Sequence, residues 1–268
     1  MSQTGVLLVG HGTRSAAGIG CVQRLGRLVA ERMPQQTVRH CFLELHDQSI
    51  GWAIDELAAV GVQRLAVVPV LLFAAGHARS DIPEQCRAAA VGRMELQQAD
   101  VLGCHPALVE LSHRRFLETL SPAESVVPGK TCLLLVGRGS YDAEATAEMR
   151  RFAERRQDRL PGVDVQVAFI AMAKPAVAEA IENLAASDFE QIVVQPHLLF
   201  PGELFDGLRQ RVLQQAQIPS KQQWRLAPLL AGDLGSGDIA DRLLVDAIVD
   251  RAADALSRFG VAVPPHSA

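Results

Sequence analysis

Three side chains that can bind metals or accept protons follow apolar stretches of this chain. His11 stands between two glycines in GVLLVGHGTRS (residues 5–15), Glu44 lies in CFLELH, and His77 follows a glycine in LLFAAGHARSDIP. Neutral imidazole binds divalent ions and accepts protons near pH 7. A carboxylate beside two histidines can take up protons as well. These residue types therefore indicate metal binding or acid–base chemistry.

The apolar stretches themselves predict the elements that position these side chains. Residues 5–9, 38–43 and 64–73 read as strands, and the carboxyl ends of parallel strands form the edge where ligands bind. If the first and third strands are neighbours, His11 and His77 face the same crevice. The glycines around His11 would allow a sharp turn that exposes its imidazole.

An internal repeat covers much of the chain. GVLLVGHGTRS at 5–15 resembles CLLLVGRGSYD at 132–142, with an offset of 138 − 11 = 127 residues. The same offset carries Pro69 onto Pro196, and the Leu-Leu-Phe of residues 71–73 onto that of residues 198–200. One offset that persists along the chain indicates a duplicated domain.

The second copy lacks all three candidates. His11 aligns with Arg138, Glu44 with Ala171, and His77 with Leu204 or, after a one-residue shift, Glu203. Residues that hold the fold should be needed in both copies, so their joint loss indicates one shared task that only the first half performs.

Each half alternates between predicted strands and helices. Strands without polar alternation favour a parallel sheet covered on both faces. We therefore predict an α/β protein of two tandem, duplicated domains, residues 1–122 and 130–262, each a mainly parallel four-stranded sheet flanked by helices. The first half has helices at 16–33, 49–60, 83–91 and 106–120 and a fourth strand at 95–102. In the second half, strands are predicted at 132–136, 163–170, 191–200 and 223–226, and helices at 142–156, 174–186, 204–215 and 238–259. A linker is expected at 121–130 and a frayed tail at 261–268.

Composition argues against several classes of protein. The net charge of −4 and the 4% of aromatic residues give neither a basic field nor a stacking surface for nucleic acid. The five cysteines contain no CxxC pair, and no stretch approaches the ~20 apolar residues of a membrane span. The first glycines do not fit GxGxxG or GxxxxGK[ST], so no nucleotide cofactor is expected. With no basic segment before the first apolar run, we expect a cytoplasmic protein.

In these segments the chain resembles the class II chelatases of the CbiX and SirB type. The matching pieces are LLVGHGTR, FLEL and VVPVLLFAAGHARSDIP, and both halves are covered, because the long members of that family are fused duplications. Residues 45–49 (LHDQS) replace a more usual proline-containing stretch. The resemblance implies two flavodoxin-like, chelatase-type domains that insert Co²⁺ or Fe²⁺ into sirohydrochlorin, in cobalamin or siroheme biosynthesis.

The resemblance also implies roles for the candidates. His11 and His77 would bind the incoming metal, and His11 and Glu44 would assist deprotonation of a macrocycle held between the domains. The divalent metal is then a substrate, with no organic cofactor, and the protein is expected to be a monomer with two pseudo-symmetric domains.

Further residues are candidates for binding the macrocycle. The loop of Leu72, Phe73, Ala74, Ala75 and Gly76 would offer a flat apolar wall. Arg14 and Arg138 would bind carboxylates, since the guanidinium fork matches that group; a solvated side chain accounts for Arg138 equally well. His197 reads as buried and hydrogen-bonded, with a position facing the cleft as the less favoured alternative.

Two other functions stay open at this stage. A non-catalytic metal or tetrapyrrole carrier could use the same pocket, although a carrier would need no proton acceptor such as Glu44. A two-lobed periplasmic-type binding protein is disfavoured by the absence of an evident signal peptide and by the loss of the candidate residues in the second half. Among metals, nickel is a further alternative.

Overall fold

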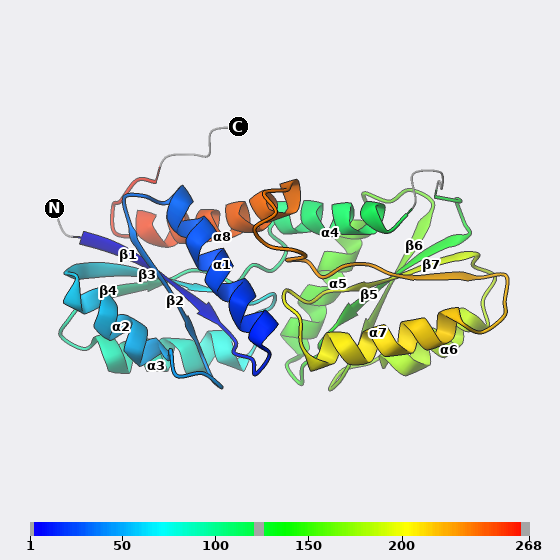
Figure 1. Ribbon diagram of the computed structural model, residues 1–268, viewed down its shortest axis with the longest axis horizontal. Coiled ribbons are helices and arrows are strands. Elements are labelled where there is room, and N and C mark those ends of the chain that lie inside the picture. The colour runs from blue at the N-terminus through cyan, green and yellow to red at the C-terminus, as the bar shows by residue number, and fades with distance from the viewer. Residues whose placement is uncertain (1–2, 121–125, 264–268) are drawn as a thin grey trace. The chain divides into compact units, whose positions relative to one another are not determined.

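The computed structural model describes residues 3–120 and 126–263. Residues 121–125 of the predicted linker and residues 264–268 of the predicted tail lie outside this range. The described part forms two compact units, and each is an α/β structure with a parallel four-stranded sheet, as predicted (Figure 1).

The first unit consists of Met1–Ala107 and Asp233–Ala268. Its sheet has the order β2-β1-β3-β4, so β1 lies between β2 and β3. All neighbouring strands are parallel, and Val9 near the end of β1 is in register with Cys41 and Pro69. The strands are β1 (Gln3–Gly10), β2 (Thr37–Phe42), β3 (Val62–Pro69) and β4 (Glu95–Gln98).

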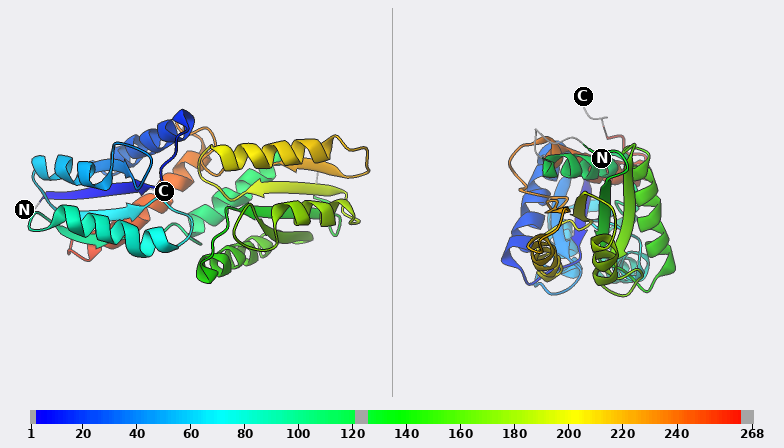
Figure 2. Two further views of the ribbon diagram at one scale, coloured as in Figure 1. Left: turned by 90° about the horizontal axis from the view of Figure 1, so that it is seen from below. Right: turned by 90° about the vertical axis from the view of Figure 1, so that its right-hand side faces the viewer.

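Helices cover both faces of this sheet. On one face α1 (Ala16–Arg32) packs with α8 (Ile239–Ser257), and on the other α2 (Ile50–Ala59) packs with α3 (Ile82–Ala90) (Figure 2). The middle of β1, residues 6–9, is fully buried for this reason. Ser49 caps α2: its hydroxyl accepts a hydrogen bond from the N–H of Trp52.

The second unit is the continuous segment Leu108–Gly232. Its parallel sheet has the equivalent order β6-β5-β7-β8. The strands are β5 (Thr131–Gly137), β6 (Val163–Phe169), β7 (Gln191–Pro196) and β8 (Gln223–Leu226), and the helices are α4 (Pro106–Thr119), α5 (Ala143–Gln157), α6 (Val177–Ala185) and α7 (Glu203–Ala216).

The two compact units exchange their last helices. The last helix of the first repeat, α4, belongs to the second unit, and the last helix of the second repeat, α8, belongs to the first unit. In the second unit, the side-chain amide of Gln195 in β7 donates to the backbone oxygen of Ser112 in α4 at 2.8 Å. In the first unit, Arg32 of α1 pairs with Asp246 of α8 at 2.9 Å. The compact units therefore differ from the ranges 1–122 and 130–262, which follow the duplication along the chain.

Three strands end earlier than the sequence suggested. The predicted strand at 95–102 stops at Gln98. The predicted strands at 64–73 and 191–200 stop at Pro69 and Pro196. Proline has no backbone N–H to continue the ladder, and the apolar residues that follow form loops instead. The loop after Pro69 lies at the edge of the first sheet that carries the candidate site, and the loop after Pro196 lies at the equivalent edge of the second sheet.

Among residues 3–120 and 126–263, no helix is long and apolar enough to cross a membrane.

Candidate functional site

The two candidate histidines lie side by side at the carboxyl edge of the first sheet. His11 follows β1, and His77 opens a π-helical turn, η1 (His77–Asp81), that leads into α3. Because β1 and β3 are neighbours, the imidazole rings meet edge to face, with centroids 4.7 Å apart and planes at 84°. Their side chains are 27% and 37% exposed, so an ion from solvent can reach them.

Glu44 joins this pair from the second loop. Its Oε1 lies 3.3 Å from Nδ1 of His11. The backbone N–H of Glu44 donates to the carbonyl of His11 at 3.2 Å, and that of Leu43 donates to Gly10 at 2.9 Å. β2 ends at Phe42, so Glu44 lies in the loop after the strand rather than at its end. Backbone pairing between the two loops thus holds the carboxylate beside the imidazole.

Only one of the two glycines around His11 is needed for this arrangement. Gly12 has φ = +112°, and a Cβ there would collide with the backbone oxygen of Glu44. Gly10 ends β1, and a Cβ at Gly10 would meet only ordinary contacts, the shortest 3.6 Å. The turn that brings the His11 loop against the Glu44 loop therefore depends on Gly12, whereas the sequence assigned it to both glycines.

The second unit keeps this backbone without its chemistry. Gly139 has φ = +92°, and a Cβ there would collide with the backbone oxygen of Ala171. Leu45 and its equivalent Met172 share a left-handed φ of 62°. In the described second unit, Ala171 stands in place of Glu44. The two units therefore share the backbone conformation of these loops, whereas only the first unit has the carboxylate.

Asp81 belongs to the site and was not among the predicted residues. Its Oδ2 lies 2.6 Å from Nδ1 of His77, and the two side chains are 46% and 37% exposed. The signal in the sequence was the spacing of four residues in HARSD, which places both side chains on one helical face. Whether those residues form a helical turn was not evident from the strand pattern before them.

The predicted macrocycle loop lies next to His77. Leu72, Phe73, Ala74 and Ala75 are half-buried, and Gly76 is exposed. Backbone bonds anchor both ends of the loop: Gly103 donates to Leu72 at 2.9 Å, and Arg79 donates to Ala75 at 3.1 Å.

The remaining predicted residues are Arg14, Arg138 and His197. Arg14 is exposed after β1, and Arg138 is exposed after β5 of the other unit. His197 is buried, as the favoured interpretation had it, but lies just after β7 rather than within a strand. Its ring packs on Phe152 with centroids 4.3 Å apart. Burial, and then the nearby Arg156, lower the pKa of His197 to about 3.

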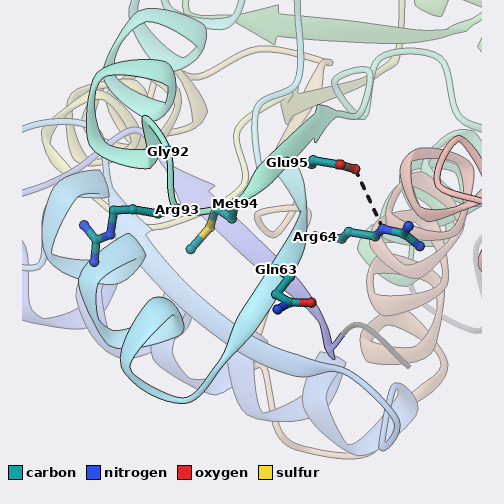
Figure 3. A pocket seen from close by; sticks show the side chains of 6 residues that line it. All are labelled: Gln63, Arg64, Gly92, Arg93, Met94 and Glu95. Atoms are coloured by element: carbon teal, nitrogen blue, oxygen red, sulfur yellow. Dashed lines mark ion pairs between the residues drawn. The ribbon is translucent and has the colours of Figure 1, made fainter.

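A shallow pocket lies at the opposite edge of the first sheet, near the starts of β3 and β4 (Figure 3). Its charged groups already have partners: Arg64 lies 3.7 Å from Glu95, and Arg93 lies 2.6 Å from Asp55. None of the predicted site residues lines this pocket, so it offers no support for the chemistry considered above.

Fold and site together define a two-domain α/β protein whose first unit presents two histidines and a carboxylate at one edge of its sheet. Within the described residues, no three or more His, Cys, Asp or Glu side chains form a group that could hold a metal ion by themselves. The chain belongs to the CbiX family, whose model matches residues 5–119 and 132–255. This match confirms the resemblance seen in the sequence.

Curated relatives are similar over most of their length. The chain is 28% identical to the sirohydrochlorin ferrochelatase of Priestia megaterium, over 84% of this chain and 83% of the relative. It is 25% identical to the sirohydrochlorin cobaltochelatase of the same organism, over 83% of this chain and 72% of the relative.

Solved structures share the fold. SirB from Bacillus subtilis with Fe³⁺ matches with a TM-score of 0.77 at 23% identity, covering 96% of this chain and 98% of that one. SirB from Bacillus subtilis subspecies spizizenii, in complex with cobalt, matches with a TM-score of 0.74 at 21% identity, covering 96% and 97%.

Proposed function

We propose that this protein is a cytoplasmic sirohydrochlorin chelatase that inserts Co²⁺ or Fe²⁺ into the macrocycle. The observation that carries the proposal is the edge-to-face contact of His11 and His77 at 4.7 Å, with Glu44 at 3.3 Å from His11. Membership of the CbiX family supports it, as do relatives named for both ferrochelatase and cobaltochelatase activity.

In this mechanism His11 and His77 hold the incoming ion. Two histidines fill only part of a divalent ion's coordination sphere, so positions stay open for the ring nitrogens. Imidazole suits borderline ions such as cobalt and iron without selecting between them. The ion is therefore held weakly enough to pass to the macrocycle, and the choice of metal depends on supply as well as on the site.

Proton removal follows from the contact between His11 and Glu44. The macrocycle loses two N–H protons as it gains M²⁺, so the charge balances. When the ion leaves His11 for the ring, the imidazole nitrogen that held it can take one of these protons. Glu44 stabilises the imidazolium through Nδ1 and can pass the proton to solvent, because its side chain is 46% exposed. The second proton leaves by the same route or directly to water.

The macrocycle itself would be held by apolar and cationic groups. The half-buried loop Leu72–Ala75 offers an apolar surface beside His77. The exposed guanidinium groups of Arg14 and Arg138 suit the peripheral carboxylates of sirohydrochlorin. At the position equivalent to His11, the second unit thus has Arg138, a carboxylate-binding group in place of a metal ligand.

An anaerobic absorbance assay tests the proposal. Protein is mixed with sirohydrochlorin and Co²⁺, Fe²⁺ or Ni²⁺, beside H11A and the control H105A, in which the lost histidine is one that pairs with Asp250 at 3.4 Å. We expect metallation faster than without protein, abolished in H11A and kept in H105A. Metallation rates equal to those of the protein-free control for every metal would overturn the proposal that the protein is a chelatase.

Glu44→Gln separates the enzyme from a carrier. An enzyme needs the proton acceptor, so this variant should still bind metal and macrocycle but lose turnover. A carrier needs only ligands, and its loading would be unchanged by the substitution.

A further inference from the structure

We propose that Asp81 is a positioning residue that holds the His77 ring so that its Nε2 atom faces the incoming metal. The inference rests on the proposed function, in which His77 is a metal ligand. The contact that carries it is the 2.6 Å between Asp81 Oδ2 and His77 Nδ1. Ligating histidines commonly donate their second ring nitrogen to a carboxylate, which fixes the orientation and tautomer of the ring.

The carboxylate of Asp81 is not used to start the helix that follows it. Asp81 directly precedes α3, where an aspartate side chain often accepts from the backbone N–H two or three residues on; its own backbone is helical (φ −67°, ψ −46°), because η1 runs straight into α3. Here it makes no such hydrogen bond. Pro83, in the first turn, has no N–H to offer. The side chain is therefore directed to His77 instead of to the helix.

The local backbone supports the same pairing. His77 and Asp81 are the first and last residues of the π-helical turn, which Ile82 closes by donating its N–H to the carbonyl of His77. Single π-helical turns are rare and often mark functional sites. The turn places the two side chains over one another, with the carboxylate at Nδ1.

The second repeat has lost both partners together. At the offset of 127 residues, His77 and Asp81 correspond to Leu204 and Leu208; with the one-residue shift they correspond to Glu203 and Gly207. There α7 begins directly at Glu203 as an α-helix. If Asp81 served the fold alone, the second unit should need an equivalent, as it needs Gly139. Its loss along with the histidine indicates that Asp81 serves His77.

The chemical consequence is a choice of tautomer. A neutral imidazole carries one N–H, and the carboxylate beside Nδ1 keeps the proton there, which leaves the lone pair on Nε2 for a metal. Glu44 stands in the same relation to Nδ1 of His11. Both histidines then direct Nε2 toward the metal. Asp81 holds the His77 ring through Nδ1 and leaves Nε2 available as a ligand.

The first test reads the tautomer in the protein without metal. Imidazole ¹⁵N spectra are recorded at mildly alkaline pH, where histidine is neutral, for wild type, Asp81→Asn and Asp81→Leu, with His77→Ala for assignment. We expect His77 as the Nδ1–H tautomer in wild type and a shift toward Nε2–H in D81L, with a smaller shift in D81N, whose amide oxygen can still accept. Asp238→Asn is the matched control, because Asp238 caps α8 through its carboxylate, which accepts from Asp241 at 2.9 Å.

The second test uses Co²⁺ alone and then the metallation assay. Loss of a carboxylate behind a ligating histidine typically costs roughly 10–100-fold in metal affinity, so Co²⁺ should bind D81L more weakly by about that factor and D238N as tightly as wild type. In turnover, the KM for Co²⁺ should rise while the KM for sirohydrochlorin stays constant.

The outcomes separate this inference from the proposed function. An unchanged tautomer and unchanged Co²⁺ affinity in D81L would overturn the role of Asp81, even if wild type metallates sirohydrochlorin. A changed tautomer and weakened Co²⁺ binding would uphold it, even if no metallation is found. A folded D81N that shows loss of thermal stability alone, with both readouts intact, would assign Asp81 to the fold and overturn the proposal.

Discussion

The backbone oxygen of Glu44 occupies the space that a side chain at residue 12 would need. Gly12 lies directly against it with φ = +112°, so the backbone of the loop after β1 packs closely on the loop after β2. The same close packing occurs in the second unit between Gly139 and Ala171. The distance between the proposed metal ligand and the proposed proton acceptor therefore depends on a glycine that performs no chemistry.

Gly12→Ala should reduce both stability and metallation. The left-handed conformation alone costs a non-glycine residue about 1–2 kcal/mol, and the collision with Glu44 must move one loop away from the other. Stability is measured by urea unfolding and turnover by the absorbance assay. Gly51→Ala is the control, because Gly51 lies inside α2 and its added Cβ would meet only Ser49 Oγ at 3.8 Å. Wild-type turnover in G12A would contradict the role of this contact.

Arg14→Ala and Arg138→Ala should each raise the KM for sirohydrochlorin by about 10-fold or more. A hydrogen bond to a charged group contributes about 1.5–3 kcal/mol, and both guanidinium groups are proposed to bind carboxylates of the macrocycle. The KM for Co²⁺ should not change. Arg87→Ala is the control, since this exposed arginine bonds the carbonyl of Pro83 within its own helix. An equal rise of the KM for sirohydrochlorin in R87A would show that the effect reflects only the loss of a positive charge.

Fragments of the chain should fold according to the compact units and not according to the repeats. Residues 108–232 contain the second sheet with helices α5 to α7 and α4 from Leu108 onward. Residues 130–262 lack α4 and carry α8, whose buried apolar residues belong against the first sheet. We expect 108–232 to unfold cooperatively by circular dichroism and 130–262 to aggregate or show no cooperative transition. Equal folding of both fragments would show that the exchanged helices are dispensable.

Acidification should destabilise the second unit through His197. The pKa of this buried histidine is lowered to about 3 in the folded state, whereas the unfolded chain takes up a proton near the ordinary value of 6.5. The unfolded state therefore binds more protons between about pH 6.5 and pH 3, and stability falls with falling pH by at most about 1.4 kcal/mol per unit from this residue. Burial also lowers the pKa of His113 in the same unit, which adds to the slope.

Two variants isolate the contribution of His197. His197→Val introduces the residue of the first repeat, Val70, and His197→Gln keeps a polar side chain. Both remove the titrating group, so urea unfolding from pH 7 to pH 5 should show a shallower loss of stability in each, whatever their stability at pH 7. A slope equal to wild type in both would exclude His197 as the source.

The sequence by itself determined the features that are local or repeated. Apolar stretches located the strands, although those at 64–73 and 191–200 were predicted to run past the prolines that end them, and the offset of 127 residues revealed the duplication. The same offset made His11, Glu44 and His77 candidates, because the second copy lacks all three. With β1 and β3 as neighbours, their meeting at one edge followed from the general geometry of parallel sheets.

Only the tertiary structure decided which partner each element and side chain takes. The sequence does not show that α4 and α8 change units, because an amphipathic helix can cover any apolar sheet face of suitable shape. It does not show that Gly12 needs its conformation and Gly10 does not, since that depends on where the backbone of Glu44 lies. Asp81 and His77 are four residues apart in the chain, yet their contact forms on a π-helical turn after β3, and Pro83 removes one of the N–H groups that the carboxylate could otherwise cap. Each of these partners depends on the course of the folded backbone, which local composition and periodicity do not encode.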